Sequence, residues 1–160
     1  MNAVAKLEAE LSWPEKVAFL AHRFRAITDM DNDRDMPVTH SFEPGMYVRE
    51  MFIPKDTYFI GREHRHGHHC VLVSGSVVVM SADGETPLSA PAELMTVPGY
   101  QMVLRALTDV VGRTYHPNPA ESRDIAALEA EAFHPAEEVF KLGRDVSRRV
   151  EEAMTCLAQP

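Results

Sequence analysis

The chain has 160 residues, enough for one domain with its own core, and its 45% hydrophobic and 25% charged residues are ordinary for a soluble globular protein. The formal net charge of −8 disfavours nucleic acid as the main partner, because phosphate binding needs a basic surface. No apolar run approaches a membrane span, no secretory signal opens the chain, and Cys70 and Cys156 lie too far apart in sequence to indicate a disulfide framework. We therefore expect a cytoplasmic protein without a membrane partner.

Residues 1–35 predict a helical extension followed by a linker. Val17, Leu20 and Phe24 recur at the spacing of an amphipathic helix. Ser12 and Glu15 stand three residues apart with a proline between them, which is the pattern of a capping box at a helix start. The four aspartates in residues 29–35 indicate an acidic, turn-prone connector, because a calcium loop would need a glycine and a closing glutamate that this segment lacks.

Residues 36–118 predict a mainly β domain, because short apolar runs alternate there with turn residues. Asp83-Gly84 is typical of a tight turn. Many short strands at close spacing indicate a sandwich or a barrel. Helical spacing returns in residues 119–160, whose helices either cover an open end of the barrel or form a dimer contact. We expect strands at 47–53, 57–60, 64–73, 76–80, 93–97, 101–107 and 110–116.

Residues 63–70 contain four of the eight histidines and directly precede a run dense in β-branched residues. If the strand begins inside this cluster, His64, His66 and His68 point to one face, as in a metal site. The helical zinc-protease motif also has histidines four apart, but it needs a glutamate where this chain has Arg65, and Gly67 would weaken a helix. A solvated cluster that binds nothing tightly is the alternative to a metal site.

The order of these features resembles the cupin superfamily, in which a histidine-bearing strand precedes a glycine turn and a Pro-Gly pair precedes a later strand. On that pattern Gly75 is the glycine of the first motif, and His64 and His68 stand at its second histidine and its glutamate. The first histidine position holds Arg62, and Gln101 follows the Pro-Gly pair where a histidine is usual. The resemblance implies a mainly β, cupin-type (jelly-roll) β-barrel with flanking N- and C-terminal α-helices, in a homodimer.

A closer resemblance, over residues 36–128, is to small and largely uncharacterised cupin-like proteins encoded by phages and prophages. It rests on the histidine cluster and on the stretches PVTHSFEPGMYVREMFIPKDT, VPG and TYHPNPAE. In that group histidines stand at the positions of His64, His68 and His116, and His66 is an addition of this chain. From the residues, we expect these three histidines to hold a divalent metal ion (zinc, iron, manganese or nickel), with His66 as a fourth ligand or proton shuttle. Alternatively, His66 and one neighbouring histidine, about 6.6 Å apart along an extended strand, are the ligands. On an extended strand His64 and His68 would stand roughly 13 Å apart, so a bend at Gly67 is needed.

Several further residues are candidates for the site. Glu50 and Glu63 are candidate carboxylate ligands, and Cys70 is either a soft metal ligand, a nucleophile or a small buried side chain. Arg49 and Arg105 lie in expected strands and either bind an anionic substrate or face water. With domains at 1–35, 36–118 and 119–160, two functions are open: a metal-dependent enzyme acting on a small molecule, or a non-catalytic cupin that binds a small molecule or sugar or serves as a phage accessory or structural protein.

Overall fold

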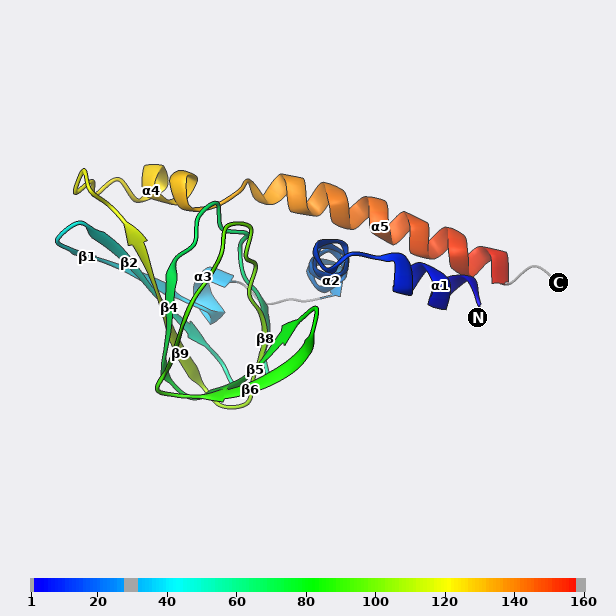
Figure 1. The fold of residues 1–160 in the computed structure, drawn as a ribbon, viewed down its shortest axis with the longest axis horizontal. Helices are drawn as coiled ribbons and strands as arrows, with labels where there is room; N and C mark the ends of the chain where they lie inside the picture. The colour runs from blue at the N-terminus through cyan, green and yellow to red at the C-terminus, as the bar shows by residue number, and fades with distance from the viewer. Residues whose placement is uncertain (1, 28–31, 158–160) are drawn as a thin grey trace. The chain divides into compact units, whose positions relative to one another are not determined.

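The computed structural model describes residues 2–27 and 32–157, and the chain forms two compact units (Figure 1). One unit, the helical unit, consists of residues 1–29 and 135–160, and the other, the β unit, of residues 30–134. Of the acidic connector expected at 29–35, residues 29–31 lie outside the described residues, and Asn32–Asp35 forms the short helix α3. None of the described helices is both long and apolar enough to span a membrane.

The helical unit contains α1 (Ala3–Glu10), α2 (Trp13–Ile27) and α5 (Ala136–Leu157). The capping box predicted at the start of α2 is confirmed: the backbone N–H and the hydroxyl of Ser12 both donate to the Glu15 carboxylate at 2.9 Å. These bonds and the guanidinium of Arg149 lower the pKa of Glu15 to about 2. The carboxylate therefore stays ionised and ties α2 to α5.

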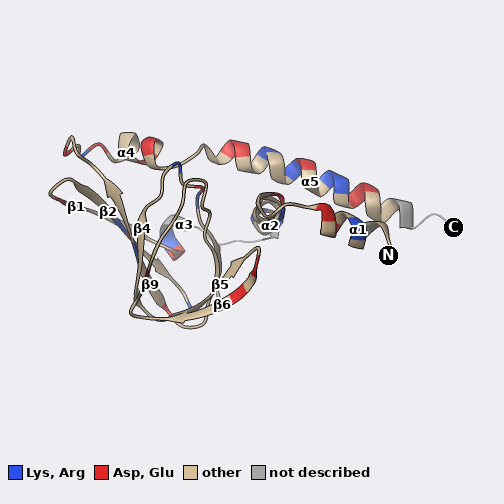
Figure 2. Cartoon of the chain, in the orientation of Figure 1, with Lys and Arg blue, Asp and Glu red and all other residues tan. Residues whose placement is uncertain are grey.

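The contact between α2 and α5 depends on small and apolar side chains. Val17, Ala18 and Val146 are almost fully buried. Gly143 lies so close to the backbone carbonyl of Ala18 that a side chain there would displace one of the helices. Acidic and basic residues alternate along the rest of α5 (Figure 2), which gives this helix a polar face opposite its packed face.

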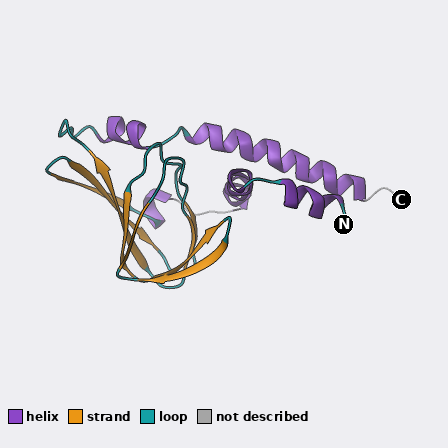
Figure 3. Ribbon diagram, in the orientation of Figure 1, coloured by secondary structure: helices purple, strands orange, loops and turns teal. Residues whose placement is uncertain are grey.

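The β unit is built from nine strands, drawn in orange in Figure 3. Each of the seven expected strands overlaps one of them, and two were missed. Both missed strands, β1 and β6, lie at sheet edges, and β6 is polar, exposed and contains Pro87, so neither carries the apolar alternation of a buried strand. Their bounds are β1 (Val38–Glu43), β2 (Met46–Ile53), β3 (Tyr58–Ile60), β4 (His69–Ser74), β5 (Ser76–Ser81), β6 (Gly84–Ser89), β7 (Ala92–Met95), β8 (Val103–Ala106) and β9 (Val110–Pro117).

The strands pair in a nested order that defines the architecture. The β5–β6 hairpin is innermost, and β4 pairs with β7, β3 with β8 and β2 with β9, all antiparallel. The pairs fall alternately into a five-stranded sheet, β1-β2-β9-β4-β7, and a four-stranded sheet, β3-β8-β5-β6. This arrangement of eight strands in two sheets is a jelly roll. The expected mainly β fold with flanking helices is therefore confirmed.

The core of the β unit lies between the two sheets. Ile53, Val77, Leu104 and Val110 are buried there and contact partly buried residues of both sheets. The helix α4 (Ile125–Ala132) also belongs to this unit, and the side chain of Asp124 caps its first turn. The chain directly after α4 reaches the histidine cluster.

Candidate functional site

The segment of residues 61–68 is a loop, and β4 begins only at His69. The expectation of a strand over His64–His68 is therefore wrong. The backbone of His64 hydrogen-bonds the loop before β8, donating to the Tyr100 carbonyl at 3.0 Å and accepting from the Gly99 N–H at 2.8 Å. Gly67 lies against the chain after β7, where a Cβ would stand 2.6 Å from the Thr96 carbonyl oxygen. The close approach that only glycine permits bends the segment.

This bend and the pairing of β9 bring three of the predicted histidines together. The ring centroids of His64 and His68 lie 3.6 Å apart, and His116, on β9, lies 5.5 Å from the first and 5.1 Å from the second. All three side chains are buried, with His64 7%, His68 3% and His116 6% exposed. We refer to these three residues as the histidine triad.

Hydrogen bonds fix the orientation of the triad. The hydroxyl of Thr96 donates to the backbone carbonyl of His68 at 3.1 Å. The Thr96 hydroxyl oxygen therefore acts as the acceptor for the backbone N–H of His68, at 2.9 Å, and for the Nδ1 of His68, at 2.8 Å. The Nδ1 of His68 therefore carries the proton, and its Nε2 is the acceptor in the 3.1 Å contact with the Cys70 thiol. His64 Nδ1 faces the Tyr100 carbonyl at 3.4 Å.

Burial keeps the triad neutral. Desolvation, followed by repulsion from the neighbouring imidazoles and from Arg49, lowers the pKa of His64 and of His116 to about 3. Desolvation likewise lowers the pKa of His68, and it raises the pKa of Cys70 to about 12. At neutral pH the site therefore presents three uncharged imidazoles and a thiol, and Cys70 is not a thiolate nucleophile.

One imidazole nitrogen of the triad has an unusual environment. His64 Nε2 is buried and, among the residues that the structure describes, has no hydrogen-bond partner. A buried polar atom of this kind is rare in proteins and indicates a missing ligand, water or ion. Neutral imidazoles whose Nδ1 atoms face protein oxygens, as in His64 and His68, suit a transition metal ion, whereas His116 contacts the Thr114 hydroxyl through Nε2 at 3.0 Å.

The rings are not, however, arranged around one point. Across residues 2–27 and 32–157, no group of three or more His, Cys, Asp or Glu side chains has the arrangement of a metal site. The rings of His64 and His68 are stacked face to face, with their planes inclined by only 26°, so the in-plane lone pairs do not converge on one point. Binding of an ion by all three would require these two rings to separate.

The fourth predicted ligand, His66, lies elsewhere. Its side chain is exposed and lines a separate cavity of about 220 Å³ together with His116 and Tyr47. Gly67, the bend in the loop, turns His66 away from His64 and His68. The structure therefore brings together three of the four predicted ligands.

The candidate carboxylates have other partners. Glu50 pairs with Arg113, its neighbour across the β2–β9 pair. Glu63 lies 3.9 Å from the imidazole of His134. Arg105 is exposed on β8 and lies 3.6 Å from Asp56. Of the two roles considered for this arginine, the structure agrees with the one in which it faces water.

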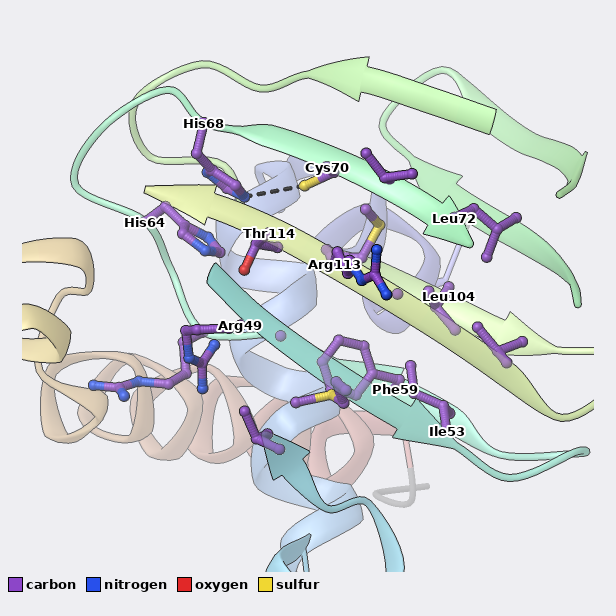
Figure 4. Close-up of a pocket in the computed structure, with 18 of the residues that line it drawn as sticks. Arg49, Ile53, Phe59, His64, His68, Cys70, Leu72, Leu104, Arg113 and Thr114 are labelled. Atoms are coloured by element: carbon purple, nitrogen blue, oxygen red, sulfur yellow. Dashed lines mark hydrogen bonds between the residues drawn. The ribbon is translucent and has the colours of Figure 1, made fainter. Parts of the chain in front are cut away.

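Two members of the triad, His64 and His68, line a cavity of about 700 Å³ within the β unit, whereas His116 lines the smaller cavity described above. Several polar groups gather at one end of the larger cavity, where His64, His68, Cys70, Thr114 and Arg49 are found, and Arg113 lies farther along the cavity (Figure 4). The opposite end is apolar, with Ile53, Phe59, Leu72 and Leu104 in the wall (Figure 4). A cavity of this size with a few converging polar groups is typical of a small-molecule site.

Phe133 and Glu129, from the end of the β unit, complete the polar end together with Arg49, and sequence reasoning missed both of them. Phe133 is 2% exposed and contacts the His64 ring at 4.6 Å between centroids. The guanidiniums of Arg49 and Arg62 lie 4.8 and 4.1 Å from the Phe133 centroid, and both contact the carboxylate of Glu129. No local pattern links α4 to the histidine cluster, because the contact exists only in the folded chain.

Comparison with known proteins adds a likeness of fold. No family model and no curated protein matches the chain, so the resemblance to phage proteins stays a prediction. The similar solved structures include the cupin domain of an XRE family transcriptional regulator from Enterobacter cloacae, with 12% identity over 51% of this chain and 94% of that one and a TM-score of 0.43. They also include a cupin superfamily protein from Desulfitobacterium hafniense. Its sequence is 10% identical, the match covers 58% of this chain and 84% of that one, and the TM-score is 0.45.

A third similar structure is an enzyme, the salicylate 1,2-dioxygenase from Pseudoaminobacter salicylatoxidans. It shares 11% identity over 64% of this chain and 31% of its own, with a TM-score of 0.48. Identities and scores at this level describe a broad likeness of fold and nothing of activity. The two cupin-domain structures and this enzyme are thus similar to the chain in fold alone.

Proposed function

We propose that this chain is a cupin-like, metal-binding protein whose cavity takes a small molecule beside the ion. The ion is a divalent transition metal, and the ligands are His64, His68 and His116. The observation that carries the proposal is the buried, unpartnered Nε2 of His64 next to two other neutral imidazoles. A neutral imidazole with a free lone pair is the form that binds a metal ion.

Each neighbouring residue has a definite part in this site. Thr96 and the Tyr100 carbonyl hold the Nδ1–H groups, which turns the Nε2 atoms of His68 and His64 toward the interior. Phe133 covers the triad and excludes water from it. When bound there, the ion supplies a Lewis acid to a ligand oxygen or nitrogen at the polar end of the cavity.

The metal proposal is tested by elemental analysis of the protein purified without a histidine tag after growth in metal-supplemented medium. We expect about one equivalent of metal per chain, and less than roughly 0.1 equivalent in the double variant His64→Gln/His116→Gln. The variant His66→Gln is the matched control, because it removes an exposed histidine of the same loop. Circular dichroism confirms that the variants are folded. An equal metal content in the wild type and the folded double variant would contradict the proposal.

A metal-free binding protein is the second candidate. The 3.6 Å stack of His64 and His68 favours it, because rings in this arrangement do not share one coordination point. In that case the triad is a neutral polar wall whose nitrogens hydrogen-bond the ligand directly. A metal content below roughly 0.1 equivalent in the wild type after supplementation would select this candidate.

A further inference from the structure

The polar end of the cavity contains one more positive charge than its own residues balance. Arg49 lies 3.2 Å from one oxygen of Glu129, and Arg62 lies 3.1 Å from the other. Two guanidiniums thus share a single carboxylate. The cluster has a net charge of one positive unit, next to a cavity whose remaining lining is largely apolar and includes Arg113, itself paired with Glu50.

Arg49 also has an unused donor. Its Nε is buried and has no hydrogen-bond partner among the described residues, and its side chain is only 13% exposed. Leaving a charged donor buried and unpaired is costly. Arg49 lines the cavity beside His64, and Figure 4 shows its side chain at the polar end. Phe133 packs against the guanidinium and limits its movement.

We infer that Arg49 binds the carboxylate of a small amphipathic acid, whose apolar body lies among Met51, Ile53, Phe59 and Leu104. A guanidinium binds a carboxylate through paired N–H groups, and the free Nε–H is one donor of such a pair. A singly charged group matches the single unbalanced charge of the Arg49–Arg62–Glu129 cluster. Most of the remaining lining is apolar, and the guanidinium of Arg113, which also lines the cavity, is already paired with Glu50, so the body of the ligand is mainly hydrocarbon-like.

This inference rests on the proposed function in treating the cavity as the ligand site, but it does not require the metal ion. The two can therefore fail separately. Metal content tests the triad, and binding of an acid to metal-stripped protein tests Arg49.

The test uses octanoate as the probe, with octan-1-ol and octylamine as matched compounds of equal chain length. Each is titrated calorimetrically into the full chain, first metal-stripped and then zinc-loaded. We expect octanoate to bind at least about tenfold more tightly than octan-1-ol, and octylamine not to bind, because only the carboxylate pairs with Arg49. Arg49→Gln should weaken octanoate binding by about tenfold or more and leave octan-1-ol unchanged.

Two further variants control the result. Arg105→Gln removes an arginine of the same unit that is paired with Asp56 outside the cavity, and it should bind octanoate as the wild type does. Arg49→Lys keeps the charge but loses the paired donors, so its affinity should fall between those of the wild type and Arg49→Gln. If Arg49→Gln does not fold, the octanoate affinity of Arg49→Lys compared with that of the wild type tests the inference instead.

Equal affinities for octanoate and octan-1-ol, or no octanoate binding at millimolar concentration, would overturn the inference whatever the metal content. Octanoate binding that depends on Arg49 in a protein without metal would support the inference and reject only the metal ion of the proposed function.

Discussion

Acidification of the metal-free protein should destabilise the β unit through the buried histidines. In the folded chain the pKa values of His64 and His116 are about 3, against 6.5 for an unperturbed histidine. Between these values the unfolded chain takes up protons that the folded chain cannot. The free energy of unfolding is therefore unaffected by these residues above about pH 6.5 and falls as the pH decreases toward about 3.

The size of the effect follows from the shift. At about pH 4.5, two units below the ordinary value, each of these histidines lowers the free energy of unfolding by about 3 kcal/mol, at about 1.36 kcal/mol per unit. Two such residues remove on the order of 5 kcal/mol. Because domains are usually stable by about 5–15 kcal/mol, this is a large part of the total.

The assay is urea unfolding at about pH 7 and about pH 4.5, with the metal removed by a chelator. Trp13 is the single tryptophan and lies in α2, so its fluorescence follows the helical unit. Amide hydrogen exchange of β4 and β9 follows the β unit and should show the larger loss of protection in acid.

The variant His64→Gln isolates the cause. It should lose about 3 kcal/mol less than the wild type between these two pH values, because one of the two strongly shifted groups is gone. His66→Gln, which changes an exposed side chain, should keep the wild-type dependence. The reasoning would be refuted if His64→Gln and the wild type lost equal free energy on acidification.

Three substitutions make further tests. Gly67→Ala should destabilise the β unit by about 1–3 kcal/mol, measured by urea unfolding, because the new Cβ would stand 2.6 Å from the Thr96 carbonyl oxygen; a neutral effect would show that this approach does not shape the loop. Thr96→Val should lower metal affinity about 10–100-fold in competition with a chelating dye, because His68 loses the acceptor that orients its ring; unchanged affinity would remove Thr96 from the site. Ser12→Ala should destabilise the helical unit by about 1 kcal/mol, measured by the fluorescence of Trp13, because the start of α2 loses its cap; an unchanged unfolding midpoint would contradict this account.

Much of the local structure follows from the sequence. The capping box of Ser12 and Glu15 is visible because its partners are three residues apart. The central strands are visible because each has the apolar, β-branched composition of a buried strand. Edge strands such as β6 have no such composition, since one side of the strand has no partner and its faces are exposed.

The histidine run was conspicuous, but its geometry was not predictable from its own residues. An extended segment would have kept His64 and His68 apart, and only the contact of Gly67 with the chain after β7 bends the loop and stacks the rings. His116 joins them because β9 pairs with β4, with Tyr115 opposite His69.

Local patterns thus predicted the long helices, the central strands, the helix cap and three of the clustered histidines, because periodicity and capping act between neighbours in the chain. The tertiary structure alone decided that His64 meets His116 and that Arg49 shares Glu129 with Arg62. These residues are far apart in the chain. The nested pairing of the strands and the packing of α4 and Phe133 against the histidine loop bring them together. Burial of the folded core then stabilises these contacts.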